Sequence, residues 1–133
     1  LGVPRELFYD PSLFAIVPMG FCYPGTGAGG DLPPRPECAE KWRARLLAAL
    51  PNIELILPLG RYALEWHLGK SGMARSLADT VRNWPAHLAE GLAPMPHPSP
   101  RNIRWFQANP WFEAEMVPAV RAKVHRLLGI GPA

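Results

Sequence analysis

Ile53-Glu54-Leu55-Ile56-Leu57 is a short apolar run, and Gly60 separates it from a helical pattern over residues 61–68. Short apolar runs bounded by turn residues are typical of buried strands. A strand followed by a glycine and a helix forms the first half of a β-α-β unit. This stretch therefore predicts an α/β fold.

Two further apolar runs, residues 14–19 and 92–95, are also strand candidates. Helical patterns lie between and after the three runs, over residues 37–50, 103–107 and about 109–128, with a short helix or an irregular segment over 72–82. Continuous apolar strands that alternate with helices indicate a parallel sheet. Because three strands make a thin sheet and the sequence begins at Leu1, we expect an N-terminal βα portion to precede these residues.

The composition is that of one globular domain, which we place over residues 1–133. The net charge is only +3, and a mild basic bias after residue 97 fits either a solvated helix face or a phosphate-bearing partner. Proline and glycine gather in residues 18–36 and 85–100, which predicts long ordered loops. No apolar run has the length of a membrane helix, and no signal peptide is evident. Two cysteines do not make a secreted disulfide framework, so we expect a cytoplasmic protein. We also expect it to be a monomer.

A histidine held between prolines follows the third apolar run, in the sequence His97-Pro98-Ser99-Pro100-Arg101-Asn102. Proline fixes its own φ and biases the residue before it toward extended geometry, so His97 and Ser99 have few backbone conformations left. Ser99 can cap the following helix with Pro100 at its first position, and Arg101 adds charge beside the free N–H groups. The motif predicts a rigid loop that carries a titratable donor next to an anion site.

A glycine-rich run, Gly25-Thr26-Gly27-Ala28-Gly29-Gly30, matches the G-x-G-x-x-G pattern of dinucleotide-binding proteins. That fingerprint must open a helix, so that the pyrophosphate meets the helix N-terminus. Here a proline-rich segment, residues 31–36, follows instead. A dinucleotide site is therefore disfavoured, and we expect these glycines to let the backbone pass close to a bulky group.

The two cysteines, Cys22 and Cys38, are sixteen positions apart. Two thiols cannot close a tetrahedral metal site, so they are either small packing residues or half of a larger ligand set. The aromatic residues Trp105 and Trp111 lie near arginines, as side chains that stack on bases do. Phe112 is instead a core residue, because it lies on the apolar stripe of the last helix with Met116, Val120, Val124 and Leu127. We interpret three other histidines as surface or structural residues: His67, His87 and His125.

Taken together, these motifs resemble the uracil-DNA glycosylase superfamily. The residues 97–100 at a strand end look like its second active-site motif, and residues 21–39 resemble the segment between the third and fourth cluster cysteines of the iron–sulfur uracil-DNA glycosylases. Residues 57–63 are similar to the strand–glycine–helix unit that follows, and Asn109-Pro110-Trp111-Phe112-Glu113 looks like a signature of a bacterial branch. The resemblance covers nearly the whole chain.

The resemblance implies a three-layer α/β/α domain with a short parallel sheet that removes uracil or a related damaged base from DNA. The target nucleotide is flipped out of the stack, and His97 matches the donor that stabilises charge on the departing base. The resemblance assigns DNA contacts to Pro98, Ser99, Pro100, Arg101 and Asn102. It also implies a base pocket at Met19 and Gly20, and a 4Fe-4S cluster on Cys22 and Cys38 only if further cysteines complete it; we expect no cofactor on residues 1–133 alone.

Three departures from the family pattern bear on activity. The water-activating motif, the aromatic that stacks on uracil and the first two cluster cysteines are not in this chain, so we expect residues 1–133 alone not to release a base. The strand before Cys22 reads Val17-Pro18-Met19-Gly20 and lacks the asparagine that reads the uracil edge, which leaves a different lesion open. The loop over residues 26–36 is also richer in glycine and proline than the family's usual stretch.

Two alternatives stay open beside the glycosylase interpretation. The first is a superfamily member that binds DNA or a nucleotide and has lost base hydrolysis, which the missing asparagine favours and the intact His97 motif disfavours. The second is a nucleotide-dependent enzyme that uses the glycine run, and saturable binding of NAD would support it.

Overall fold

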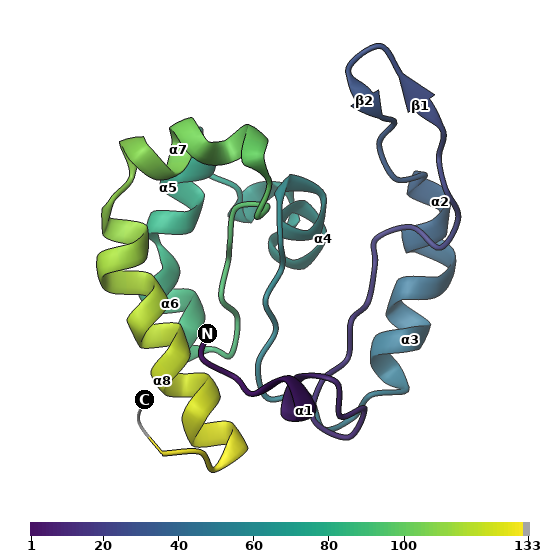
Figure 1. Ribbon diagram of the computed structural model, residues 1–133. Coiled ribbons are helices and arrows are strands. Elements are labelled where there is room, and N and C mark those ends of the chain that lie inside the picture. Colours follow the sequence, from purple (N-terminus) through teal and green to yellow (C-terminus); the bar gives the residue numbers. More distant parts are fainter. Residues whose placement is uncertain (132–133) are drawn as a thin grey trace. The chain divides into compact units, whose positions relative to one another are not determined.

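The computed structural model describes residues 1–131, and the chain forms two compact units (Figure 1). The first unit comprises Leu1–Phe14 and Glu54–Ala133, and the second comprises Ala15–Ile53. No helix of the described residues is both long and apolar enough to cross a membrane. The single domain expected over residues 1–133 stays a prediction.

Two extended segments of the first unit lie side by side in parallel. Ile56 pairs with Leu92, and Leu59 pairs with Met95, as isolated bridges. The hydrogen bonds that join the segments include Ala93 N to Ile56 O at 2.8 Å and Met95 N to Pro58 O at 3.1 Å. Proline has no N–H to donate, and these segments contain three prolines that interrupt the ladder: Pro58, Pro94 and Pro96. The predicted strands over residues 53–57 and 92–95 are therefore extended and parallel, but they meet only at two bridges.

The third predicted strand, residues 14–19, is assigned neither to a strand nor to a bridge in the described chain. Pro18 lacks a ladder donor, and the carbonyl oxygens of Val17 and Pro18 accept hydrogen bonds from a side chain, Arg43, instead of from a neighbouring strand. The short parallel sheet and the three-layer arrangement thus stay predictions.

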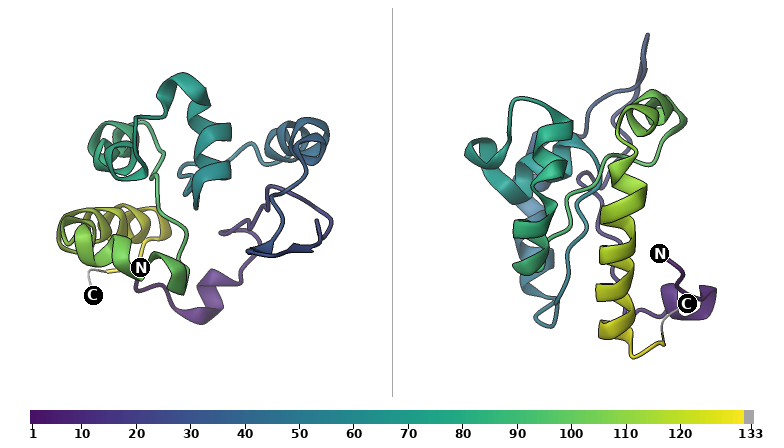
Figure 2. Two further views of the ribbon diagram at one scale, coloured as in Figure 1. Left: turned by 90° about the horizontal axis from the view of Figure 1, so that it is seen from above. Right: turned by 90° about the vertical axis from the view of Figure 1, so that its left-hand side faces the viewer.

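Helices make up most of the first unit. The helix predicted at 61–68 is present as α4 (Arg61–Gly72), with a kink at Gly69. The last predicted helix ends at the expected residue, Leu128. It consists of a π-helical turn, η3 (Phe112–Met116), followed by α8 (Val117–Leu128), the long yellow helix of Figure 2. The other helices are α1 (Arg5–Phe8), α5 (Leu77–Arg82), α6 (Trp84–Ala89), η2 (Pro100–Asn102) and α7 (Ile103–Ala108).

The core of the first unit lies between the extended segments and the helices α5, α6 and α8. It is formed by the apolar side chains of Val81, Leu88, Ala93, Met95, Trp111, Phe112, Met116, Val120 and Val124. The predicted apolar stripe of the last helix is confirmed at four positions of that core and is wrong at Leu127, which is exposed. Burying this stripe holds α8 against the segment that ends at His97.

The second unit consists of one helix and one small hairpin. The helix predicted over residues 37–50 is present as three consecutive stretches: α2 (Pro36–Cys38), η1 (Ala39–Arg43) and α3 (Ala44–Ala48). The strands β1 (Thr26–Gly27) and β2 (Gly30–Asp31) pair antiparallel, with Thr26 opposite Asp31. The glycine run therefore builds a hairpin, and no helix follows it directly. A Cβ on Gly27 would lie 3.1 Å from Cδ2 of Leu32, so the expected bulky neighbour is a leucine of the same hairpin.

Candidate functional site

The carboxyl ends of the two parallel segments meet at Gly60 and His97. Gly60 N donates to Met95 O at 2.9 Å, and this bond closes the pairing just before both chains turn away. Open α/β folds bind ligands at the carboxyl ends of their parallel strands. The structure therefore places the predicted histidine where such a site is expected.

The loop that follows His97 has the predicted rigid geometry. The backbone of Ser99 is extended, its hydroxyl accepts from Arg101 N at 3.3 Å, and Pro100 occupies the first position of η2. The predicted cap is thus confirmed, with a short 3₁₀ turn leading into α7. The Ser99 hydroxyl is engaged by this cap, and any contact that it makes to DNA stays a prediction.

Two hydrogen bonds fix the main-chain carbonyl of His97. The carbonyl oxygen accepts one from Ser99 N at 2.8 Å and another from the side-chain amide of Asn102 at 2.7 Å. These two bonds occupy both lone pairs of the carbonyl. The His97 side chain is exposed, so the loop is ordered while the imidazole stays accessible to a ligand.

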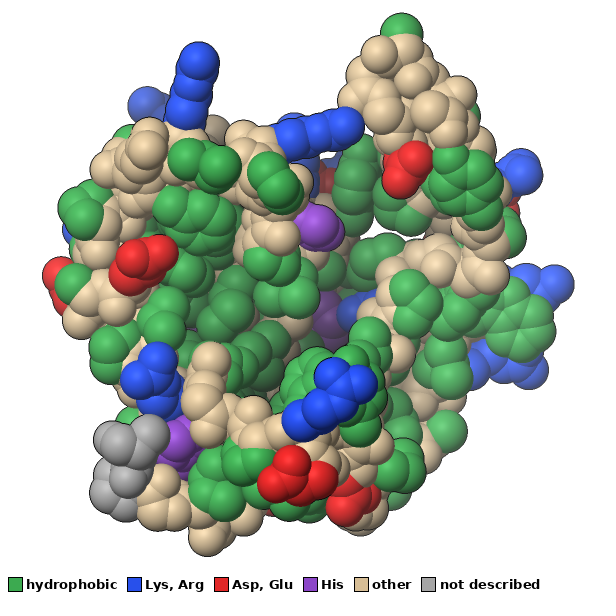
Figure 3. Space-filling view, in the orientation of Figure 1, with side chains coloured by type: hydrophobic (Ala, Val, Ile, Leu, Met, Phe, Trp, Pro, Cys, Tyr) green, Lys and Arg blue, Asp and Glu red, His purple; other side chains and the backbone are tan. Residues whose placement is uncertain are grey.

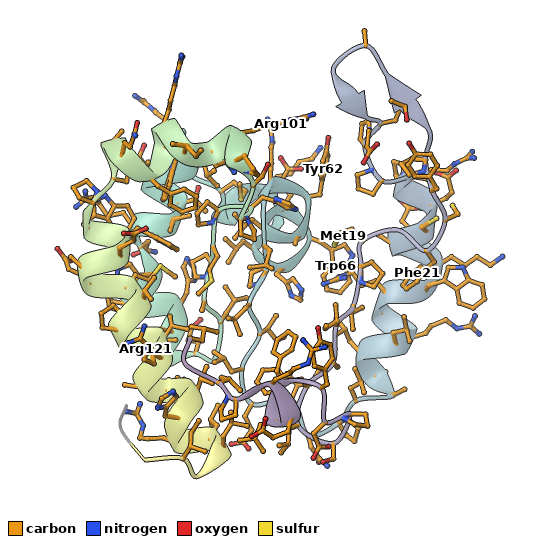
Figure 4. The ribbon with its side chains drawn as sticks, viewed as in Figure 1. Met19, Phe21, Tyr62, Trp66, Arg101 and Arg121 are labelled. Atoms are coloured by element: carbon orange, nitrogen blue, oxygen red, sulfur yellow. The ribbon has the colours of Figure 1, made fainter. Side chains whose placement is uncertain are left out.

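Positive charge lies beside this loop. The side chains of Arg101 and Arg104 are exposed, and neither takes part in the ion pairs recorded among the described residues. Basic side chains stand at the surface over α7 in the space-filling view (Figure 3). Arg101 projects from η2, and Tyr62 projects from the first turn of α4 (Figure 4). In that turn Arg61 Nε donates to Glu65 Oε1 at 2.7 Å, and this hydrogen bond raises the pKa of Arg61.

The cysteines lie together in the second unit. Cys22 Sγ and Cys38 Sγ are 3.8 Å apart, and both are free thiols. Their proximity raises the pKa of Cys22, first through the hydrogen bond to Cys38 and then through charge repulsion. No group of three or more candidate metal ligands exists among residues 1–131. The sequence holds no third cysteine, so a cluster role for the pair stays a prediction.

Met19 and Gly20, the predicted base pocket, belong to the second unit. Both are half-buried, and a Cβ on Gly20 would lie 3.4 Å from Cβ of Pro34. The segment that carries them is held by Arg43, whose Nη1 donates to Val17 O and Pro18 O at 3.1 Å each. The base-pocket role of Met19 and Gly20 stays a prediction.

Two features of this site were missed by the sequence interpretation. It did not foresee that Gly60 packs directly against His97, or that Asn102 bonds the main chain of His97. Gly60 could have been found as a glycine at the junction of a strand and a helix, where a positive φ is common. Asn102 carried no such signal, because asparagine forms hydrogen bonds in almost any loop.

The comparison with protein families agrees with this geometry. The model of the uracil DNA glycosylase superfamily matches residues 1–121. The match includes the parallel segments, the Gly60 turn and the His97 loop, which together build the site. The chain belongs to the uracil DNA glycosylase superfamily.

Proposed function

We propose that this protein removes uracil or a related damaged base from DNA by hydrolysing the N-glycosidic bond. The observation that carries the proposal is the exposed imidazole of His97, held on an ordered loop at the carboxyl ends of two parallel segments. Membership of the superfamily supports DNA as the substrate.

In this proposal His97 donates a hydrogen bond to a carbonyl oxygen of the flipped base. As the bond between C1′ and the base nitrogen breaks, its electron pair moves onto the base, and negative charge grows on that oxygen. A fixed donor stabilises this charge more than it stabilises the neutral base, and therefore lowers the barrier. Water then adds to C1′, and the departing base gains a proton.

The loop after His97 supplies the DNA contacts. Arg101 is exposed and charged, and η2 begins three residues after His97. We propose that Arg101 contacts a phosphate next to the flipped nucleotide, and that Pro98, Ser99 and Pro100 form the rigid wall against which the strand lies. Phosphate contacts of this kind position the DNA without reading its sequence.

A second candidate function is DNA binding without base hydrolysis. It is favoured by residues 17–20, where proline and methionine offer no side-chain amide to read the edge of a uracil. The two candidates share the His97 loop and differ in whether His97 changes a rate.

The test uses the gene product that contains this sequence and an oligonucleotide with a single uracil, which is treated with alkali to cut any abasic site. We expect strand cleavage, a loss of about a hundredfold in rate for His97→Ala, and DNA affinity within about twofold of the unmodified protein for the same variant. His87→Ala is the matched control, since His87 lies on α6. Binding without cleavage in every variant would instead support the second candidate, and absence of both would overturn the two candidates together.

We also propose that Cys22 and Cys38 serve as two ligands of a 4Fe-4S cluster in a protein that supplies two more thiolates. The two thiols lie together in the second unit, which supports a shared role, but because each would bind a different iron they would have to move apart from 3.8 Å when a cluster is bound. Iron and sulfide analysis of the gene product, with its visible absorption, tests the assignment. A colourless, iron-free protein after anaerobic purification would return the cysteines to a packing role.

A further inference from the structure

The backbone of Gly60 has a conformation that other residues rarely adopt. Its φ is 82° and its ψ is 171°, and the residue is buried at the point where the extended segment ends and α4 begins. Its N–H donates to Met95 O, and its carbonyl accepts from Leu64 N at 3.0 Å. Gly60 thus joins the parallel pairing to the first turn of α4, and a side chain at this φ would be strained.

His97 lies directly against this turn. A Cβ built on Gly60 would be 3.1 Å from Cβ of His97 and 3.5 Å from its Cδ2. Carbon atoms in contact prefer a separation of about 3.5–4.0 Å. Because Gly60 has no side chain, Cβ of His97 can pack directly against its backbone.

Asn102 fixes the same residue through its carbonyl group. The Asn102 side-chain amide donates to His97 O at 2.7 Å, across five positions of the chain. Contact with Gly60 limits where Cβ of His97 can lie, while this bond limits the orientation of the peptide plane that follows it. Together the two contacts constrain both ends of the Cα–Cβ vector from which the imidazole projects.

We propose that Gly60 and Asn102 are positioning residues that set the direction of the His97 imidazole. The catalytic consequence rests on the proposed function, but the positioning itself does not. A donor that stabilises developing charge works only within a narrow range of distance and angle. A displacement of about 1 Å can cost about a hundredfold in rate.

The primary test compares Gly60→Ala with Gly129→Ala. Gly129 also has a positive φ, of 64°, but a Cβ there would meet no atom within 4 Å. Both variants place a side chain at a positive φ, although the left-handed helical conformation of Gly129 costs an alanine less than the conformation of Gly60 does. Only Gly60→Ala introduces a contact with His97, and Asn102→Leu, described next, tests the same histidine without this strain. We expect Gly60→Ala to shift the imidazole NMR signals of His97 while those of His87 stay in place, and Gly129→Ala to leave the His97 signals unchanged.

A second variant, Asn102→Leu, leaves the Gly60 turn intact and keeps the proposal testable if Gly60→Ala does not fold. Leucine has nearly the size of asparagine but no donor. We expect it to shift the His97 signals as well, and to slow single-turnover base release by about tenfold with DNA affinity within about twofold of the unmodified protein. A residue that held DNA directly would weaken the affinity instead.

The outcomes separate this proposal from the proposed function. His97 signals that overlay those of the unmodified protein in both Gly60→Ala and Asn102→Leu would overturn the positioning roles, whatever the activity. If the unmodified gene product releases no base, the proposed function fails, and the NMR comparison still decides whether Gly60 and Asn102 set His97. Shifted His97 signals with unchanged base release would show that the two residues do not position the histidine for the reaction, and would overturn the proposal.

Discussion

Cys22 Sγ lies 3.8 Å from Cys38 Sγ, and this contact keeps the Cys22 thiol protonated to higher pH than an isolated thiol. The hydrogen bond to Cys38 is the largest cause of the raised pKa, and charge repulsion from Cys38 is the next. Because only the thiolate reacts with alkylating agents, a raised pKa lowers the reactive fraction at any pH below it.

Cys38→Ala should therefore accelerate the alkylation of Cys22 near neutral pH. The substitution removes both main causes of the raised pKa, so the thiolate forms at lower pH. Iodoacetamide labelling followed by mass spectrometry across a pH series measures the effect. Glu37→Gln is the control, since Glu37 is the smallest cause in the same direction and should change the rate little. Equal rates in Cys38→Ala and the unmodified protein would contradict the effect of the pair.

Arg101→Gln should weaken DNA binding and reduce its dependence on salt. Arg101 is exposed beside the His97 loop, and each phosphate contact releases about one counterion from DNA. We expect the slope of log K against log salt to fall in magnitude by about one for a uracil-containing duplex and equally for an undamaged duplex. Fluorescence anisotropy at several salt concentrations measures both.

Arg121→Gln provides the matched control for that measurement. Arg121 is also an exposed arginine, but it lies on α8, well away from Arg101 (Figure 4). The two variants have the same net charge, so they differ only in where the charge was removed. A salt slope reduced to the same extent by both variants would indicate nonspecific attraction and would count against a contact at Arg101.

The parts of the fold that depend on local signals could be predicted from the sequence. The Ser99 cap with Pro100 behind it is present, because a hydroxyl acceptor and a fixed φ act within two residues. The helix after Gly60 and the end of the last helix at Leu128 could also be predicted, because both depend on the pattern of neighbouring residues. The apolar stripe failed only at Leu127, which is exposed in the last turn of α8.

The parts that depend on distant partners could not be predicted. A run of apolar residues such as 14–19 indicates a strand, but whether it pairs with another strand depends on segments distant in sequence. Here the Arg43 side chain donates hydrogen bonds to two carbonyls of the run. The short helices α1 and α6 carry no periodic pattern long enough to indicate them. The contact of Gly60 with His97 joins segments that are far apart in sequence, and no spacing rule predicts it.

Arg43→Met should loosen the segment that carries Met19 and Gly20. Arg43 is 5% exposed, burial lowers its pKa, and its guanidinium donates to Val17 O and Pro18 O. Methionine fills similar space without a donor, so these carbonyls lose a partner. The free energy of local opening of residues 15–20 should fall by about 1 kcal/mol. Hydrogen exchange and limited proteolysis within this segment should therefore become faster.

Arg45→Met is the control for that segment. Arg45 is an exposed arginine of the same helix, and it lies over the ring of Trp42 at 5.7 Å. Its replacement removes an equal charge without touching the carbonyls of Val17 and Pro18. Equal protection of residues 15–20 in both variants would mean that Arg43 does not hold the segment.

His125→Phe should lower the stability of the first unit, because His125 is buried and joins both ends of the described chain. Its Nε2 lies 3.0 Å from Leu1 O, and its Nδ1 lies 3.1 Å from Gly131 O. Phenylalanine keeps the ring but provides no donor, and because Leu1 and Gly131 are exposed their carbonyls turn to water, so the loss is that of an ordinary hydrogen bond, about 0.5–1.5 kcal/mol. Thermal or urea unfolding measures the loss, and His87→Phe, at a half-buried histidine of α6, should change it by less than about 0.5 kcal/mol. If the two variants unfold alike, the ring of His125 acts by packing alone, and the contacts to Leu1 and Gly131 add nothing to stability.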